Sequence, residues 1–431
     1  MNNSSLPVAI IGGGPAGLAA AAHLSKRGHS FLLFESGEKL GNHFLDYAHV
    51  RLFSTWEYNI DEAAKYLLEK NGVELPNPDE LPLGGEIATK YLQPLGNLPE
   101  LKPFIYLNSK VVHTARKGFD KVKSKGREDA PFELHVESSN QEVQRYYARA
   151  VIDATGTWQQ PNPLVSGGLI EKSSSNIHYR IPDILHEDRK TFENKRVLII
   201  GSGHSAFHSI LELAKLKTKA PNTEITWMIR RSNIEEIMGG GDNDQLPERG
   251  ALGTRLKQVI SDGAVNVYTS AVVQSLRKSN GNRVIVHADV QGEPMTSGPY
   301  DEVIANTGSR PAFQFLSEIR YTADPALESV PALAPLIDPN VHSCGTVRPH
   351  GEKELRQPEK DFYIIGAKSY GRAPTFLMAT GYEQARSVTA YLCGDEKAAE
   401  RVELHLPETG VCSTNPPVLE IQLVNNNSCC S

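Results

Sequence analysis

Val8-Ala-Ile-Ile-Gly12-Gly-Gly14-Pro-Ala-Gly17 is the stretch that decides the fold, because an apolar run enters a glycine-rich turn directly before Leu18-Ala-Ala-Ala-Ala-His-Leu24, a run typical of a buried helix. The three glycines have different tasks in such a turn. Gly12 permits the tight bend, Gly14 lets a pyrophosphate approach the backbone, and Gly17 lets the helix pack on the strand. Because a helix N-terminus carries a partial positive charge, this strand, turn and helix predict a phosphate-binding site.

A second apolar strand follows the predicted helix. It covers Phe31–Phe34 and ends in Glu35. An acid in this place is suited to accept hydrogen bonds from a ribose 2′-hydroxyl. With strand, turn, helix, second strand and acid all present, the segment predicts a dinucleotide-binding unit rather than an ordinary glycine turn.

The same pattern returns later in the chain. An apolar run, Arg196–Ile200, enters Gly201-Ser-Gly203-His-Ser-Ala206, and a helix to about Leu216 and a strand over 224–229 follow. Arg230-Arg231 stands where the first unit has its acid, and paired guanidinium groups match a 2′-phosphate. We therefore expect NADPH rather than NADH, with surface arginines after a strand as the alternative. The expected contacts of this second nucleotide are Gly201, Gly203, His204, Ser205, Arg230 and Arg231.

Further strand-like segments indicate how the two units are connected. The segments 110–114, 132–136 and 146–150 are separated by polar stretches, which suggests an antiparallel insert. The run Ala150–Gly156 ends in Ala-Thr-Gly, and the run Glu302–Gly308 ends in Asn-Thr-Gly. The chain therefore has two similar halves.

The predicted fold class is α/β, with two Rossmann-like dinucleotide-binding domains, the second inserted in the first. The strand Phe362–Gly366 and a helix over 376–392 are expected to return to the first domain, and the segment 157–194, rich in Pro, Gly and Ser, to cross between the domains. The expected parts are 1–165 and 309–395 for the first domain, 190–308 for the second, and 396–431 for a C-terminal tail.

Composition places further limits on function. The chain of 431 residues is 39% hydrophobic and 22% charged, which is typical of a soluble globular protein, and we expect it in the cytoplasm. No apolar run is long enough to span a membrane, and the net charge of -6 with scattered basic residues gives no nucleic-acid footprint. Five cysteines do not form a secreted disulfide framework. The oligomeric state stays open, with a homodimer as one alternative.

With both glycine fingerprints and both Thr-Gly strand ends, the chain resembles the two-dinucleotide-domain flavoproteins, and among them most resembles the flavin-containing and Baeyer–Villiger (class B) monooxygenases. The resemblance covers about residues 6–395 in the order of the motifs. It implies FAD in the first domain and NADPH in the second. The residues expected at FAD are Gly12, Gly14, Pro15, Ala16, Gly17, Glu35, Val112, Thr155, Gly156 and Gly366.

An irregular, aromatic segment follows Glu35. Residues 37–59 contain the rings of Phe44, Tyr47, Phe53, Trp56 and Tyr58, with His43, His49 and Arg51 between them. These rings would form a wall of the flavin pocket or simply pack a long loop, and the sequence does not decide between the two.

Two departures from the family patterns are visible. The class B fingerprint F-x-G-x-x-x-H-x-x-x-[FY/W], which precedes the second glycine turn, is absent, and Asn176-Ile-His178-Tyr179 and Pro182-Asp183 stand in its position. The return strand has Gly366-Ala-Lys368 in place of the Gly-Asp pair common in disulfide reductases. Oxygenase chemistry is therefore implied by architecture and not by its signature.

Cysteine positions separate the reaction classes. Flavin-dependent disulfide reductases carry a redox cysteine pair beside the flavin, and this chain has no cysteine before Cys344. Such a reductase is excluded unless the C-terminal thiols Cys412, Cys429 and Cys430 act. The vicinal pair Cys429-Cys430 resembles the terminal pair of mercuric reductases, and the whole tail is similar to flavoproteins of arsenic-resistance gene clusters. Thiolates bind soft, thiophilic ions well, while untuned, exposed cysteines are the alternative.

The leading hypothesis is an FAD-dependent, NADPH-oxidising monooxygenase that uses O2 on a small soft nucleophile, such as a trivalent organoarsenical or a sulfur or nitrogen compound. The chemistry would be borne by the flavin, and no side chain is identified as an acid, base or nucleophile. No metal is expected. The alternatives are an NADPH-dependent thiol or metalloid reductase that uses the C-terminal cysteines, and a flavin-based redox sensor.

Overall fold

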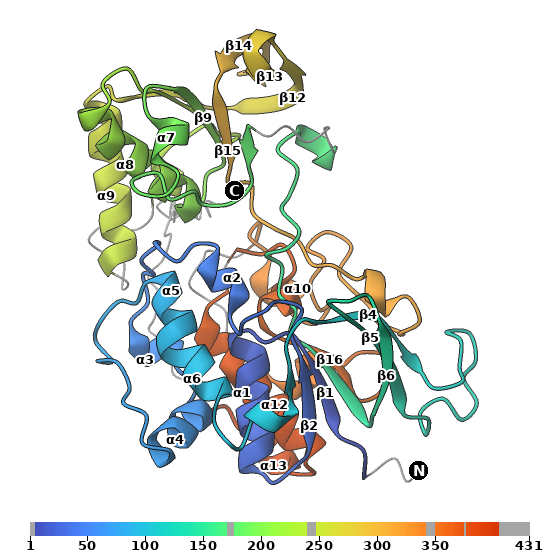
Figure 1. The fold of residues 1–431 in the computed structure, drawn as a ribbon. Coiled ribbons are helices and arrows are strands. Elements are labelled where there is room, and N and C mark those ends of the chain that lie inside the picture. The colour runs from blue at the N-terminus through green and yellow to red at the C-terminus, as the bar shows by residue number, and fades with distance from the viewer. Residues whose placement is uncertain (1–4, 170–175, 239–246, 342–349, 375, 405–431) are drawn as a thin grey trace, which may run out of the picture.

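The computed structural model describes residues 5–169, 176–238, 247–341, 350–374 and 376–404, which form two lobes (Figure 1). The lower lobe is built on a five-stranded parallel sheet in the order β16-β7-β1-β2-β3. Its strands are β1 (Val8–Ile11), β2 (Phe31–Phe34), β3 (Ile105–Tyr106), β7 (Ala150–Asp153) and β16 (Phe362–Ile364). Strand β1 is buried along its whole length, as the predicted apolar run requires.

Helix α1 (Pro15–Lys26) and helix α12 (Met378–Leu392) pack side by side against this sheet. The alanines at 19–22 of α1 are buried, so small side chains allow this close packing. An antiparallel sheet of β4 (Ser109–Arg116), β5 (Phe132–Ser138) and β6 (Val143–Ala148) shares the same hydrophobic core and confirms the predicted insert.

The upper lobe repeats the plan. Its parallel sheet has the order β11-β10-β9-β15-β8, and its strands are β8 (Ile177–His178), β9 (Arg196–Ile200), β10 (Glu224–Met228), β11 (Val265–Tyr268) and β15 (Glu302–Ala305). Val197 and Ile199 face a core with helices α8 (His204–Lys219) and α9 (Pro247–Ser261), while Leu198 and Ile200 face a second core. The second core lies under the antiparallel strands β12 (Ala271–Lys278), β13 (Val284–Val290) and β14 (Glu293–Tyr300).

Short helices complete both lobes. Helix α4 (Glu62–Lys70) is capped by Asp61, which accepts hydrogen bonds from the amides of Ala63 and Ala64. The next helical segment runs from α5 (Gly84–Glu86) through a π-helical turn, Ile87–Leu92, to α6 (Gln93–Gly96). The other short helices are α2 (Asn42–Leu45), α3 (Trp56–Asn59), α7 (Arg189–Phe192), α10 (Ala334–Ile337), α11 (Glu352–Leu355), α13 (Glu396–Glu400) and the 3-10 turns Lys102–Phe104, Ser166–Gly168, Glu235–Ile237, Asn280–Asn282, Gln314–Leu316 and Gly366–Tyr370.

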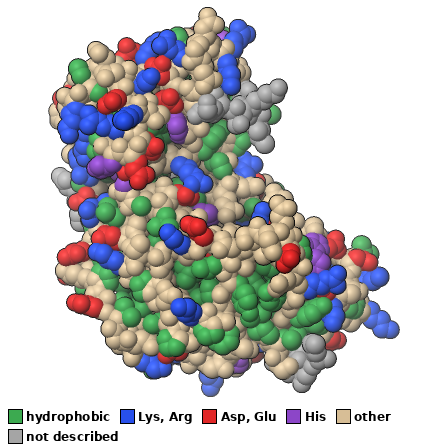
Figure 2. Space-filling view, in the orientation of Figure 1, with side chains coloured by type: hydrophobic (Ala, Val, Ile, Leu, Met, Phe, Trp, Pro, Cys, Tyr) green, Lys and Arg blue, Asp and Glu red, His purple; other side chains and the backbone are tan. Residues whose placement is uncertain are grey.

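The predicted α/β fold with an inserted second Rossmann-like domain is confirmed, because the chain leaves the first sheet after β7 and returns to it with β16. Within the segment 157–194, β8 pairs with β15 and so extends the second sheet. The molecule narrows between the lobes, and charged side chains of both signs are interspersed over the face shown in Figure 2. No helix among the described residues combines the length and apolarity that crossing a membrane requires.

Candidate functional site

The first glycine turn lies between the carboxyl end of β1 and helix α1. Gly12 has φ +107, and a Cβ added there would lie 2.7 Å from the carbonyl oxygen of Ala154, which follows β7. A Cβ on Gly17 would lie 2.0 Å from the carbonyl oxygen of Gly12. Both glycines are therefore required by close backbone packing, as the predicted turn demands.

The other side of this turn is open. A Cβ on Gly14, the N-cap of α1, would meet no atom within 4 Å, and the same holds for Gly156, which follows β7 and has φ +67. The amides at the start of α1 face this space, which suits a pyrophosphate group. The observed cradle therefore fits the dinucleotide that the sequence predicts.

The start of α12 closes in on the same turn. A Cβ on Gly381 would lie 3.5 Å from the Cα of Gly366 and 3.6 Å from the Cβ of Ala16, and one on Gly366 would lie 3.0 Å from the Cβ of Ala16. Ala16 directly follows Pro15, the first residue of α1. The structure thus brings together the residues predicted at FAD on α1 and after β16, although they are far apart in the sequence.

Glu35 is buried directly after β2, with 7% of its surface exposed. Its Oε2 accepts a hydrogen bond of 2.7 Å from the amide of Gly13, and its Oε1 accepts one of 2.7 Å from the amide of Gly37. The carboxylate therefore joins the glycine turn to the loop after β2. Its hydrogen bond to a ribose stays a prediction.

The two remaining residues predicted at FAD have different surroundings. Val112 lies at the bulge of β4, where the pairing with β5 passes from Val111 to His113. Thr155 donates from its amide and its hydroxyl to Oδ1 of Asp153, at 3.1 and 2.7 Å. The Thr155 side chain therefore already has a partner within the protein.

A buried ion pair, which the sequence did not indicate, lies beneath this site. The ammonium group of Lys368 donates to Oδ2 of Asp153 and to the carbonyl oxygen of Ala312, each at 2.6 Å, and neither charged side chain is exposed. Burial lowers the pKa of Lys368, and the charge of Asp153 opposes this shift. The only signal in the sequence is that Lys368 lies in the return segment where disulfide reductases have their Gly-Asp pair.

The second glycine turn has the same geometry. Gly201 has φ +136, and a Cβ there would lie 2.1 Å from the carbonyl oxygen of Asn306, which follows β15. Gly203 is the N-cap of α8, and a Cβ on it would meet nothing within 4 Å. His204 and Ser205 form the first turn of α8, so these four predicted residues lie together around an open helix N-terminus.

Arg230 and Arg231 are exposed just beyond the carboxyl end of β10. The amide of Gly201 lies 3.4 Å from the carbonyl oxygen of Met228, the last residue of β10, so the arginines follow a strand end that contacts the glycine turn. The amide of Ser270 donates to the carbonyl oxygen of Arg231 at 2.9 Å and so fixes the backbone there. The position agrees with a role at a nucleotide phosphate, which stays a prediction.

The aromatic segment after Glu35 lies where the two lobes meet. The ring of Tyr47 lies 4.8 Å from that of Trp158, whose indole donates to Oδ2 of Asp46 at 2.9 Å. Burial raises the pKa of Tyr47. The ring of Phe53 lies 5.3 Å from that of His204 on α8. The segment, which includes α2 and α3, therefore contacts the second domain, and its place at the flavin stays a prediction.

The predicted redox thiols Cys412, Cys429 and Cys430 lie outside the described residues, as does Cys344. Cys393 caps the end of α12 and is half-buried, and burial raises the pKa of its thiol. A raised pKa disfavours the thiolate, so Cys393 is suited to packing rather than to redox chemistry.

Comparisons with known proteins agree with this geometry. The family model of pyridine nucleotide-disulphide oxidoreductases matches residues 9–336. Among curated proteins, the probable indole-3-pyruvate monooxygenase YUCCA9 of Arabidopsis thaliana is 29% identical over 243 residues, which are 53% of this chain and 49% of the relative. The chain spans 48 to 60% of the length of the first curated relatives that it matches.

Two solved structures show the same fold. The bacillithiol disulfide reductase Bdr (YpdA) from Bacillus cereus matches with a TM-score of 0.66 and 19% identity, over 90% of this chain and 99% of its own. The cadaverine monooxygenase DfoA from Erwinia amylovora, solved with FAD bound, matches with a TM-score of 0.64 and 12% identity, over 94% and 98%. The resemblance to flavin monooxygenases is thus supported, and FAD and NADP(H) are the cofactors typical of such proteins.

Proposed function

The chain belongs to the pyridine nucleotide-disulphide oxidoreductase family, and on this premise we propose that it is an FAD-dependent monooxygenase that oxidises NADPH. The observation that carries the proposal is the absence of cysteine from residues 1–343, which include both glycine turns. Disulfide exchange at the flavin needs a thiol pair close to the ring. Oxygen transfer needs none, so it is the reaction that this cofactor site supports best.

The residues of the chain would bind and orient the cofactors. The open N-termini of α1 and α8, at Gly14 and Gly203, would hold the two pyrophosphates, and Glu35 would fix the first ribose. FAD, when bound, supplies the hydride acceptor and the reaction with oxygen. In the overall reaction NADPH supplies two electrons and the substrate two, one oxygen atom joins the substrate, and the other leaves as water with the hydride of NADPH and one proton.

We propose a soft nucleophile as the substrate, with a trivalent organoarsenical first and sulfur or nitrogen compounds next. The support is the group of thiols Cys412, Cys429 and Cys430, because polarisable sulfur binds trivalent arsenic more strongly than oxygen ligands do. In this proposal the thiols capture the substrate and do not carry electrons. Free thiols persist in a reducing compartment, so we also propose a cytoplasmic location.

The proposal is tested with the purified holoprotein, NADPH, an organic arsenite and ¹⁸O-labelled O2. We expect one NADPH and one O2 consumed for each pentavalent product, with one labelled oxygen in that product. Cys429→Ser/Cys430→Ser should raise the KM for the arsenical and leave NADPH-dependent flavin reduction intact, while Cys393→Ser serves as the matched control and changes neither. Unlabelled product, or NADPH oxidation that releases only hydrogen peroxide, would contradict the proposal.

The second candidate is an NADPH-dependent thiol or metalloid reductase, which the vicinal pair Cys429-Cys430 favours. This enzyme would work without oxygen, because its electrons pass from the flavin to a disulfide of the tail. The same variants decide the matter under anaerobic conditions. Anaerobic turnover of a disulfide or metalloid substrate that disappears in Cys429→Ser/Cys430→Ser would establish the reductase.

A further inference from the structure

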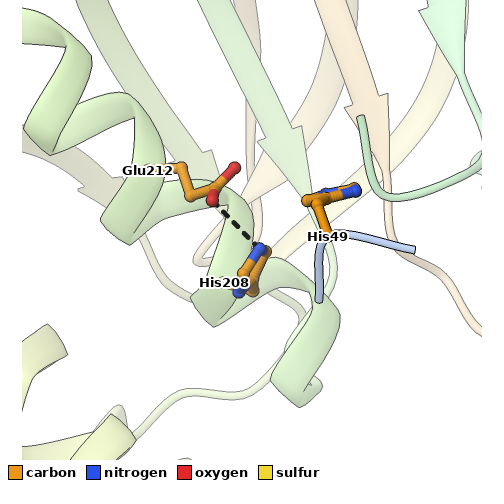
Figure 3. Close-up of side chains that lie close together, drawn as sticks. All are labelled: His49, His208 and Glu212. Carbon is orange, nitrogen blue, oxygen red and sulfur yellow. Dashed lines mark ion pairs between the residues drawn. The ribbon is translucent and has the colours of Figure 1, made fainter. Parts of the chain in front are cut away.

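Three potential metal ligands from both lobes meet between the domains. His49 lies in the aromatic segment of the first domain, and His208 and Glu212 lie one turn apart on α8 of the second. Figure 3 shows His208 and Glu212 side by side on this helix, with the segment that carries His49 beside them. Each residue offers one ligand atom, and these three atoms all lie within 4.8 Å of one another.

Several polar atoms of these three side chains lack hydrogen-bond partners. Nε2 of His49, Nε2 of His208 and Oε2 of Glu212 are buried and accept or donate no hydrogen bond among the described residues. Glu212 is 8% exposed, and its Oε1 lies 3.3 Å from Nε2 of His208. Buried polar atoms without partners are costly in a folded protein. Their gathering on three neighbouring side chains between the domains suits the binding of a cation.

We propose that His49, His208 and Glu212 bind a divalent transition-metal ion of the zinc class. Zinc bonds to imidazole nitrogen and carboxylate oxygen at about 2.0–2.2 Å, so ligand atoms in tetrahedral geometry lie roughly 3.3 Å apart. His208 and Glu212 already have this separation, because positions i and i+4 share one face of a helix. Approach of the His49 side chain completes a set of two imidazoles and one carboxylate, which leaves a fourth position for water.

The proposed ion would connect the two domains. The same loop contacts α8 at two points, since the His49 ring lies 5.7 Å from that of His208 and the Phe53 ring lies 5.3 Å from that of His204. His204 is the first residue of α8, so the metal site lies one turn from the N-terminus predicted to hold NADPH. A bound ion would therefore restrain the aromatic segment against the nucleotide-binding helix.

Zinc titration of the holoprotein tests the site. The background is Cys412→Ser/Cys429→Ser/Cys430→Ser, because tail thiolates would also bind zinc. We expect one zinc ion per chain by calorimetry. His49→Asn, His208→Asn and Glu212→Gln should each weaken binding at least tenfold, since even changes around metal ligands cost about 10–100-fold. His186→Asn is the matched control, because His186 is exposed on the same domain beside Asp183 and should change nothing.

Each variant is also unfolded thermally without zinc. The unpartnered atoms have no hydrogen bonds to lose, and the contact between His208 and Glu212 is an i,i+4 ion pair, which contributes little to stability, so the metal-free stabilities should stay close to that of the parent. If one histidine variant fails to fold, Glu212→Gln still decides the matter, because it keeps the size of the side chain and removes its charge. Unchanged zinc affinity in Glu212→Gln would overturn the proposal.

The bridge between the domains has its own readout. Zinc should slow amide hydrogen exchange in residues 46–52 of the first domain, and His208→Asn on the second domain should abolish this protection. Protection confined to α8 would mean that His49 is no ligand and would overturn the bridging site.

Discussion

The two glycine turns are built alike and closed differently. In both, a glycine with positive φ lies against the carbonyl oxygen after the returning strand: Gly12 against Ala154 in the first domain and Gly201 against Asn306 in the second. One residue earlier the domains differ. Asp153 ends β7 beside Ile11, whereas Ala305 ends β15 beside Ile200. The backbone geometry is common, and the charged groups are not.

The charged side chains of the first site are buried and bind other groups of the protein, whereas those of the second site are exposed. Asp153 is paired with Lys368, and Glu35 binds two amides, all with little exposure. In the second domain, Arg230 and Arg231 are exposed after β10. We interpret the first site as preorganised for a resident cofactor and the second as open to a nucleotide that exchanges. A site whose groups are already held in place loses less conformational entropy when it binds, which favours tight binding.

The largest effect is expected at the positive-φ glycine that the turns of both domains share. Gly201→Ala places a Cβ 2.1 Å from a carbonyl oxygen at φ +136, and Gly12→Ala places one 2.7 Å away at φ +107. Backbone strain and overpacking add, so we expect each substitution to lower the free energy of unfolding by about 4 kcal/mol or more and to leave the affected domain incompletely folded. Urea unfolding followed by circular dichroism measures this. Gly14→Ala and Gly203→Ala are the controls, because their Cβ atoms meet nothing, and equal losses in the controls would contradict the account.

The second largest effect is expected at the buried ion pair of Asp153 and Lys368, which the second domain lacks at the matching place. Lys368→Met leaves the carboxylate of Asp153 buried without its partner, which should destabilise the first domain by about 3 kcal/mol. Asp153→Ala/Lys368→Met copies the alanine that the second domain has at this place and should recover most of the loss. Chemical denaturation of both variants checks this. A double variant no more stable than Lys368→Met would show that Asp153 has a further role, such as holding Thr155.

The fold could be predicted from the sequence because its signals are local. The run Val8–Ile11, the glycines and the helix after them are adjacent in the chain, and the second unit repeats them, so order and topology follow. Glu35 was found for the same reason, since its distance from the turn is set by one helix and one strand. Each of these signals depends on residues within a single βαβ unit.

The missed features are pairs between distant segments. Lys368 meets Asp153 only after β16 returns beside β7, and His49 meets His208 only where the lobes touch. Neither pair has a spacing that periodicity would reveal. The short strand β8 was missed for the same reason. Its two residues are too few to show an alternating pattern, and they join the sheet only by pairing with β15. Tertiary approach, rather than local propensity, decides these contacts.

A smaller effect is expected at Glu35. Glu35→Gln keeps one acceptor oxygen and loses the charge, so one of the two amide hydrogen bonds and the proposed ribose contact are weakened. Hydrogen bonds to charged groups contribute about 1.5–3 kcal/mol, which corresponds to a rise in the Kd for FAD of roughly 10–100-fold. Fluorescence titration of apoprotein with FAD measures it. Glu38→Gln, an exposed neighbour, is the matched control, and an unchanged Kd in Glu35→Gln would remove Glu35 from the cofactor site.

The smallest effect is expected at the exposed arginines, and it depends on which nicotinamide nucleotide is used. Arg230→Ala/Arg231→Ala removes two cations that we place at the 2′-phosphate, so the KM for NADPH should rise about tenfold while that for NADH stays the same. The rise should shrink at high salt, because ions screen charges that water can reach. Arg277→Ala, at an exposed position of β12 in the same domain, controls for the general loss of positive charge. An equal rise in the KM for NADPH and for NADH would mean that the arginines contact the pyrophosphate that both nucleotides share. The second site, like the first, would then not recognise a 2′-phosphate on the ribose.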